Sequence, residues 1–191
     1  IDISWVCFSR VDTIDEETLF LMKKAGCHQI MYGIESGSEE ILKNINKKID
    51  RQKAIEAVKK TKKIGIECRT TFMLGNPGET EETIFKTVKF AIELDPDIAL
   101  FNITTPFPGT QMFKWAKENG YLKSEDWSKY DLSNMVMELP TISSEKIYEY
   151  YKKVFKLFYL RPSYLLKRLF KIRTLNDIKM AFNAFIAILT H

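Results

Sequence analysis

The turn at residues 75–80, Gly-Asn-Pro-Gly-Glu-Thr, has the residue types of a ligand-binding loop. It directly follows an apolar run at 72–74, so we expect a strand to end at Gly75 and a helix to begin at Thr80. A glycine turn in this position presents backbone N–H groups at the positive end of a helix dipole. The turn could therefore bind an anion or a nucleotide, although an ordinary strand-to-helix turn also uses glycines at positive φ.

Polar residues also close the three other segments that read as strands. The expected strands cover residues 3–9, 28–34, 66–74 and 97–105, and all four look apolar along nearly their whole length. The polar residues after the other three are Arg10 and Asp12, Glu35 and Ser36, and Thr104 and Thr105. Helical patterns separate the strands, which predicts an α/β fold with parallel pairing and helices over the sheet. Since parallel strands end at one edge, the four polar clusters are expected on one rim.

The starts of the intervening helices carry capping signals. Thr13 with Glu16 reads as a capping box, and Ser36 with Glu39 is expected to begin a short helix in the same way. Glu79 is expected to cap the helix that begins at Thr80.

The composition is that of a globular protein with an uneven charge. Of 191 residues, 45% are hydrophobic and 28% are charged. Residues 1–145 contain 19 Lys and Arg against 23 Asp and Glu, whereas residues 146–191 contain 10 against 2. The basic excess therefore belongs to the tail, and we expect no nucleic-acid partner. Three widely spaced cysteines argue against a disulfide framework and predict a cytoplasmic protein.

The tail predicts helices of two characters. One helix has an apolar stripe, Ile147, Tyr150, Tyr151, Val154 and Phe158, and ends at Arg161-Pro162. A second apolar set follows among basic residues, and a third helix is expected over 177–189, too short to span a bilayer. Two interpretations stay open: a helical layer packed on the sheet with solvated lysines, or a basic amphipathic surface for a membrane or another domain.

Three motifs in order resemble the radical S-adenosylmethionine (SAM) superfamily. They are Gly-Ile-Glu-Ser-Gly-Ser at 33–38, the turn at 75–80 and Thr-Thr-Pro-Phe-Pro-Gly-Thr at 104–110. The branch that is most similar often carries a cobalamin-binding domain, and the tail, with Phe-Tyr-Leu-Arg-Pro at 158–162, resembles its C-terminal extension. The resemblance implies a partial (β/α) barrel, the last four strands of six, over residues 1–122. A linker at 123–143 and a basic helical extension at 144–191 would follow.

The resemblance also implies a chemistry. Such enzymes bind a [4Fe-4S] cluster and SAM, generate a 5′-deoxyadenosyl radical and remove a hydrogen atom from a small-molecule substrate; cobalamin is an additional cofactor in this branch. The Cys-x-x-x-Cys-x-x-Cys loop that holds the cluster does not occur in this sequence. We therefore expect a fragment that needs the N-terminal half of the barrel and a cobalamin-binding domain as partners. Alone, it should be inactive and should self-associate through its open edge.

The SAM-site residues implied by the resemblance lie on the four strand ends. They are Arg10, Glu35, Ser36, Met73, Gly75, Asn76, Thr104, Thr105 and Pro106. Glu35 and Ser36 would meet the ribose, the residues at 73–76 and 104–106 the adenine, and Arg10 the methionine carboxylate. A structural pair of Arg10 with Asp12 or Glu35 is the alternative for that arginine. No catalytic residue or metal ligand is expected in the chain. A non-catalytic α/β module that binds another nucleotide or a protein partner is the alternative function.

Overall fold

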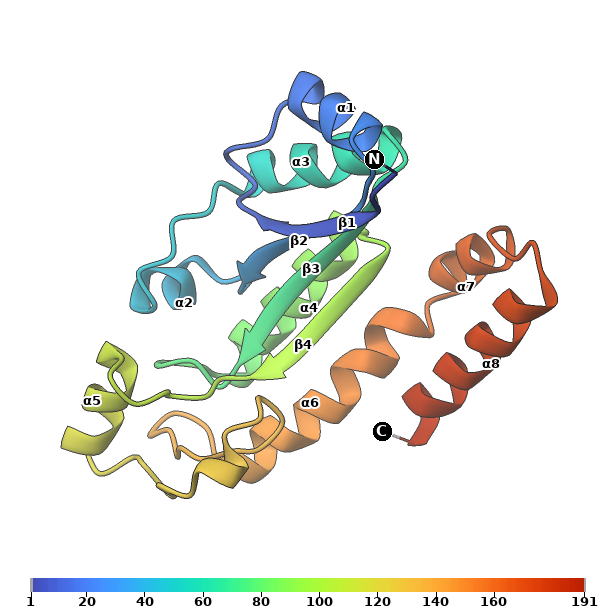
Figure 1. Cartoon of the computed structure of the whole chain (residues 1–191). Coiled ribbons are helices and arrows are strands. Elements are labelled where there is room, and N and C mark those ends of the chain that lie inside the picture. The colour runs from blue at the N-terminus through green and yellow to red at the C-terminus, as the bar shows by residue number, and fades with distance from the viewer. Residues whose placement is uncertain (1, 191) are drawn as a thin grey trace.

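A computed structural model describes residues 2–190 and shows an α/β fold around one four-stranded sheet (Figure 1). The strands are β1 (Trp5–Ser9), β2 (Cys27–Glu35), β3 (Glu67–Leu74) and β4 (Ile98–Ile103). They lie in sequence order, and every neighbouring pair is parallel. The predicted parallel α/β architecture is confirmed.

The connecting helices form one layer beside the sheet. The helices are α1 (Glu16–Lys24), α2 (Glu39–Asn44), α3 (Arg51–Lys63), α4 (Glu81–Leu94), α5 (Gln111–Glu118), α6 (Ser144–Tyr159), α7 (Pro162–Leu169) and α8 (Leu175–Thr190). Helix α1 packs on α3, α3 on α4, and α4 on α6, so the layer follows the order of the strands. Helix α6 extends it past β4, while α7 and α8 lie farther out (Figure 1).

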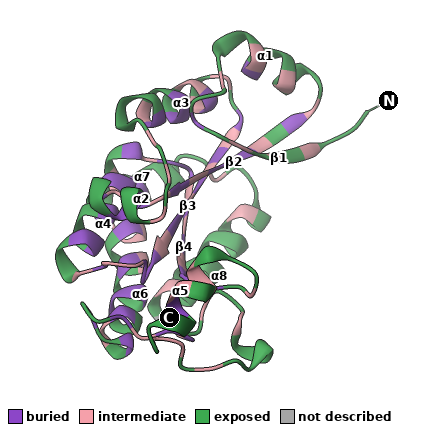
Figure 2. Ribbon diagram, turned by 90° about the vertical axis from the view of Figure 1, so that its left-hand side faces the viewer, coloured by how far each residue is buried: buried purple, intermediate pink, exposed green. Residues whose placement is uncertain are grey.

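The two faces of the sheet differ in burial and in chemistry. Along β3, buried residues such as Phe72 and Leu74 alternate with partly exposed residues such as Arg69 and Thr71, and β4 alternates in the same way (Figure 2). The strands are therefore less continuously apolar than expected. One face packs on the helices, and the other, the open face, carries mixed polar and apolar groups, as strands covered on one side do.

Aromatic side chains join α6 to the covered face. Phe72 and Phe101 stack on neighbouring strands with ring centroids 5.3 Å apart, and Phe158 of α6 meets Phe101 at 6.2 Å. The predicted α6 stripe is buried in full. Aromatic burial of this kind stabilises a core by area and by ring geometry, so α6 belongs to the same hydrophobic core as the sheet.

Three predicted helix starts need correction. Helix α1 begins after Asp15, whose carboxylate accepts the Thr18 N–H, so Thr13 does not cap it. Ser38, not Ser36, precedes α2. Thr80 caps α4 together with Thr83, so Glu79 is not the cap. Ser38 makes no side-chain capping hydrogen bond, so α2 begins without one.

Residues 121–143 pack on the body through their own backbone pairing. Leu122 and Met137 form an antiparallel bridge, and Val136 is fully buried beside them. The Lys123 N–H donates to the Val136 carbonyl at 2.8 Å. The domain boundaries remain predictions.

Candidate functional site

The carboxyl ends of the strands form one rim, where most of the predicted site residues gather. The strand arrowheads mark this rim in Figure 1. The loops that leave it begin at Arg10, Ser36, Gly75 and Thr104. The expected convergence of the strand ends is therefore present, because parallel pairing in sequence order requires it.

Glu35 ends β2 with its backbone in the left-handed region, at φ 68°. This conformation is uncommon outside glycine, costs free energy, and clusters at functional sites. The Glu35 carboxylate folds over Gly33, where an added Cβ would lie 2.6 Å from its Oε1. Lys47 Nζ lies 3.2 Å from the same oxygen. A glycine and a lysine therefore hold the carboxylate at the rim, with its side chain partly exposed.

Arg10 is oriented by Asp12 and not by Glu35. Its Nε and Nη2 donate to the two Asp12 oxygens at 2.9 and 2.7 Å. Of the two structural pairs considered for Arg10, the pair with Asp12 is the one that forms. The pair is exposed, so the guanidinium stays accessible at the end of β1.

Ser36 is fully buried and directs its hydroxyl to α4. Thr87 Oγ1 donates to the Thr83 carbonyl at 3.1 Å, so it must accept the hydrogen bond that it shares with Ser36 Oγ at 3.0 Å. Ser36 Oγ also accepts from the Ser38 N–H at 3.1 Å. Since a hydroxyl has one donor and two acceptor sites, Ser36 has one acceptor site left. Its main contribution is to hold the loop 36–38 against α4.

Asn76 joins the end of β3 to the end of β4. Its side-chain amide donates to the Met73 carbonyl and accepts from the Thr104 hydroxyl, each at 3.0 Å. Gly75, at φ 86°, makes the sharp turn that brings Asn76 back over the strand end. Asn76 is fully buried, so its role in the structure is to fix the two loops relative to each other.

Glu79 holds the backbone of Asn76 through a hydrogen bond. It is fully buried, accepts a hydrogen bond from the Thr83 hydroxyl on one oxygen, and accepts the Asn76 N–H on the other at 3.4 Å. Burial raises the pKa of Glu79 to about 6, although the hydrogen bonds from Thr83 and Asn76 oppose the rise. No pattern in the sequence indicates this network, because its members come from two loops 28 residues apart.

Thr104, Thr105 and Pro106 carry the chain along the rim after β4. All three are buried, and the Thr104 N–H donates to the Leu74 carbonyl at 2.8 Å. The Thr105 hydroxyl donates back to the Ile103 carbonyl at 3.3 Å. The Thr105 hydroxyl therefore bonds the backbone, whereas the Thr104 hydroxyl bonds Asn76, and together they hold this segment in one conformation at the rim.

The open face brings further groups close to the rim. Asn102 is the register partner of Met73, and Thr71 is the partner of Leu100. All four are partly exposed. Asn102 and Thr71 were not among the predicted site residues, because polar and apolar positions alternate only at the start of β3 and not in β4, where Asn102 is the one polar residue.

These residues fit a nucleoside and do not fit an iron–sulfur cluster. A lysine-held carboxylate suits a ribose diol, and a fixed backbone segment beside Met73 suits a flat base. The cysteines are free; Cys68, in the first half of β3, is buried on the covered face. Within residues 2–190, no group of three His, Cys, Asp or Glu side chains could hold a metal ion.

Comparison with known proteins agrees with this geometry. The family model of the radical SAM superfamily matches residues 1–91. An uncharacterized methyltransferase of Pyrococcus horikoshii is 43% identical over 171 residues, which cover 90% of this chain and 37% of the relative. The bacteriochlorophyllide d C-8(2)-methyltransferase of Chlorobaculum tepidum is 28% identical over 93% of this chain and 40% of its own length. The chain thus spans roughly two fifths of these relatives.

A solved structure shares the fold over nearly the whole chain. The cobalamin-dependent S-adenosylmethionine radical enzyme OxsB superposes with a TM-score of 0.59 at 15% identity, covering 99% of this chain and 34% of OxsB. The superposition with OxsB agrees in fold alone, whereas the family match over residues 1–91 shows a radical SAM domain in this chain. Members of that superfamily use SAM and a [4Fe-4S] cluster. A non-catalytic module is not favoured.

Proposed function

We propose that this chain supplies the nucleoside-binding half of the SAM site in a radical SAM methyltransferase. The observation that carries the proposal is the position of Glu35, Asn76 and Thr104 on one rim of the parallel sheet. The names of the two relatives support methyl transfer as the reaction class. We include cobalamin as a second cofactor because OxsB, which shares the fold, is cobalamin-dependent.

Each rim residue has a task in this proposal. The Glu35 carboxylate, held by Lys47, accepts hydrogen bonds from the ribose hydroxyls. The backbone at 104–106 and the side chain of Met73 flank the adenine, while Asn76 keeps the two loops in register. Arg10, oriented by Asp12, is our candidate for the methionine carboxylate. A bound SAM that accepts one electron from a reduced cluster would supply the radical chemistry that removes a hydrogen atom from a substrate carbon.

The proposal assigns no cluster ligand to this chain. The N-terminal half of the barrel and a cobalamin-binding domain are its proposed partners, and a small molecule is its proposed substrate. Ser36 has a supporting task, since its hydroxyl is directed to Thr87.

Glu35→Ala tests the ribose contact. A hydrogen bond to a charged group contributes about 1.5–3 kcal/mol, so we expect SAM affinity to fall about tenfold or more. The measurement is anaerobic calorimetric titration of SAM into the full-length enzyme with its cluster in place. Glu67→Ala is the matched control, because Glu67 lies at the other end of the strands and pairs with Arg69. Equal affinities for wild type and Glu35→Ala would remove Glu35 from the ribose role.

A further inference from the structure

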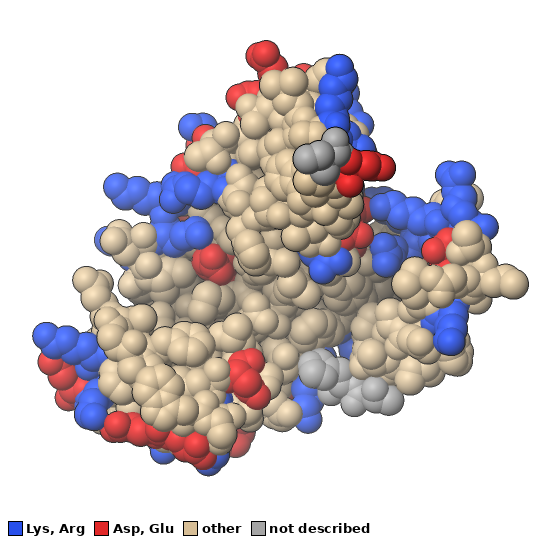
Figure 3. Space-filling model, in the orientation of Figure 1, with Lys and Arg blue, Asp and Glu red and all other residues tan. Residues whose placement is uncertain are grey.

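The outer surface of α7, α8 and their connection is apolar, and we call it the hairpin surface. It comprises Leu166, Phe170, Leu175 and Phe182. Phe170 and Leu175, on either side of the connection, are 83% and 85% exposed. The part of the molecule where Figure 1 places these helices is largely uncharged in Figure 3 and is bordered by Lys and Arg. Contiguous exposed apolar patches of this kind mark interaction sites.

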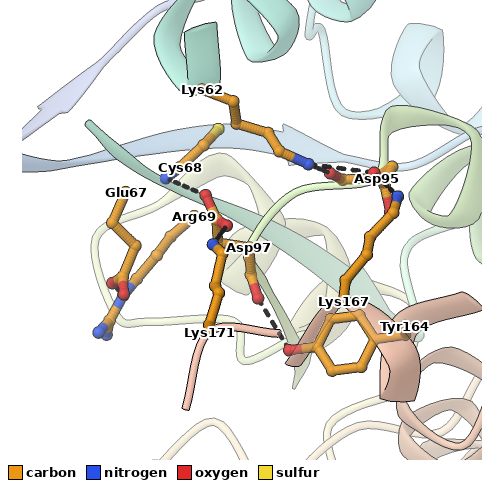
Figure 4. A network of polar contacts seen from close by, with 9 residues as sticks. All are labelled: Lys62, Glu67, Cys68, Arg69, Asp95, Asp97, Tyr164, Lys167 and Lys171. Atoms are coloured by element: carbon orange, nitrogen blue, oxygen red, sulfur yellow. Dashed lines mark hydrogen bonds and ion pairs between the residues drawn. The ribbon is translucent and has the colours of Figure 1, made fainter. Parts of the chain in front are cut away.

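Ion pairs turn the polar side of this hairpin toward the body. Lys167 Nζ lies 2.5 Å from Asp95 Oδ2, and Lys171 pairs with Asp97, which also accepts the Cys68 N–H (Figure 4). The buried Tyr164 donates its hydroxyl to the Asp97 carbonyl at 2.8 Å. Successive helix residues are about 100° apart, so Leu166 lies on another side of α7 than Lys167 and Tyr164. Phe170, at the end of α7, borders the groove between Asp97 and Lys171 and is still 83% exposed. A helix of a globular protein usually turns its apolar side toward the body and its charged side toward solvent.

Helix α8 is apolar on both of its sides. Ala181, Ala184, Phe185 and Ile188 line a groove against α6 and α7, while Leu175 and Phe182 lie on the opposite side and are exposed. Its sequence contains only two charged residues, Asp177 and Lys179. The groove-lining residues of α8 lie on the side that faces α6, so the outward residues need another explanation.

Charge distinguishes the kind of partner. Residues 146–191 contain ten basic and two acidic side chains, and Arg173 and Lys179 lie close in sequence to the exposed Phe170, Leu175 and Phe182. A protein partner usually meets a rim that offers polar groups for hydrogen bonds, whereas an anionic bilayer pairs basic groups with apolar insertion. We propose that the hairpin surface docks on an anionic lipid bilayer, with Phe170 and Leu175 at the boundary between headgroups and acyl chains.

Docking of this kind is peripheral. Among the described helices, none is long and apolar enough to cross a bilayer. Phe170, Leu175 and the outward side of α8 would lie in the plane of the bilayer surface. The rim of the sheet belongs to the body of the molecule and would take no part in docking. The inference is independent of the proposed function, because it uses no residue of the SAM site.

Vesicle co-sedimentation of the 191-residue chain tests the docking. The probes are vesicles of phosphatidylcholine alone and vesicles that also contain phosphatidylglycerol. We expect the chain to bind the anionic vesicles, and this binding should weaken with added salt. Each of the substitutions Arg173→Gln and Lys179→Gln should lower the affinity about fivefold, because each removes one basic residue. The double variant Phe170→Ser, Leu175→Ser should lower the partition coefficient about tenfold or more, since it removes the inserted side chains.

Trp127→Ser is the matched control, because it removes an exposed aromatic side chain from the loop between α5 and α6. It should bind like the wild type. Circular dichroism checks that every variant keeps its helix content. Equal binding to both kinds of vesicle, or unchanged binding of the double variant, would overturn the proposal. A vesicle-independent self-association abolished by the same double variant would overturn it too, and would assign the surface to a protein contact.

Discussion

Glu79 shows how the rim depends on a residue that no ligand would touch. It lies beneath Asn76, which in turn holds Thr104, so one buried carboxyl group supports the ends of two strands. Burial of an acid favours its neutral form, and the hydrogen bond from Thr83 only partly offsets that preference. The network is therefore stabilising and sensitive to pH at once.

Glu79→Gln should change the pH dependence of stability in a defined direction. The folded pKa of Glu79, about 6, lies above its ordinary value of 4.5, so its contribution is fully present below pH 4.5 and is lost as the pH rises through 6. The difference corresponds to about 2 kcal/mol. A neutral glutamine removes this loss. We expect the unfolding free energy of the variant, relative to wild type, to increase by about 2 kcal/mol between pH 4.5 and 7.

Urea denaturation at the two pH values measures this effect. Glu82→Gln is the control, because Glu82 is an exposed residue of the same helix and pairs with Lys86; its relative stability should change by only about 0.5 kcal/mol or less. A constant difference between Glu79→Gln and wild type across the range would show that Glu79 has an ordinary pKa.

At the scale of elements, α6 completes the edge of the sheet. The Ala99 N–H of β4 donates to the Tyr159 hydroxyl at 3.1 Å, and the same hydroxyl donates to the Ala99 carbonyl at 2.7 Å. The Leu132 carbonyl accepts the Ile103 N–H at 2.7 Å farther along. A tyrosine and a loop thus take the place of a neighbouring strand, and the tail covers this edge.

Tyr159→Phe should destabilise the chain by about 1–3 kcal/mol. The substitution keeps the ring but leaves the Ala99 N–H and carbonyl groups without this partner in a buried place, and an unsatisfied buried group costs about that much. Chemical denaturation measures the loss. Tyr148→Phe, on the exposed side of the same helix, should change stability by about 0.5 kcal/mol or less. Equal effects of the two variants would show that the edge contacts contribute nothing.

The sequence predicted the strand order and the rim because both follow from local signals. Glycine turns and apolar runs mark the strands, and parallel pairing then brings Gly75 and Thr104 to one edge. The partner of Glu35 could not be predicted, since Lys47 reaches it through the packing of the loop after α2. The role of Tyr159 could not be predicted either, because it depends on where α6 crosses β4. Contacts between distant segments require the fold first.

At the scale of the whole molecule, the two edges of the sheet differ. The tail covers β4, whereas β1 pairs within the described sheet only with β2. Val6 and Phe8, on the open face of β1, are 50% and 81% exposed. An uncovered edge with apolar residues is a template for pairing with another chain. Covering a few hundred Å² of apolar surface favours association by several kcal/mol before entropy costs, at about 25 cal/mol per Å².

We therefore predict that the 191-residue chain self-associates through β1. Phe8→Lys should weaken the association at least about tenfold, because a lysine on an edge strand must lose hydration when a second strand pairs there. Phe107→Lys is the control, since Phe107 is also exposed but lies in the loop after β4. Sedimentation velocity over a range of concentrations measures the equilibrium. A wild-type chain that stays monomeric would disprove the prediction. Association that survives Phe8→Lys and disappears in Phe170→Ser, Leu175→Ser would move the contact from the sheet edge to the hairpin surface.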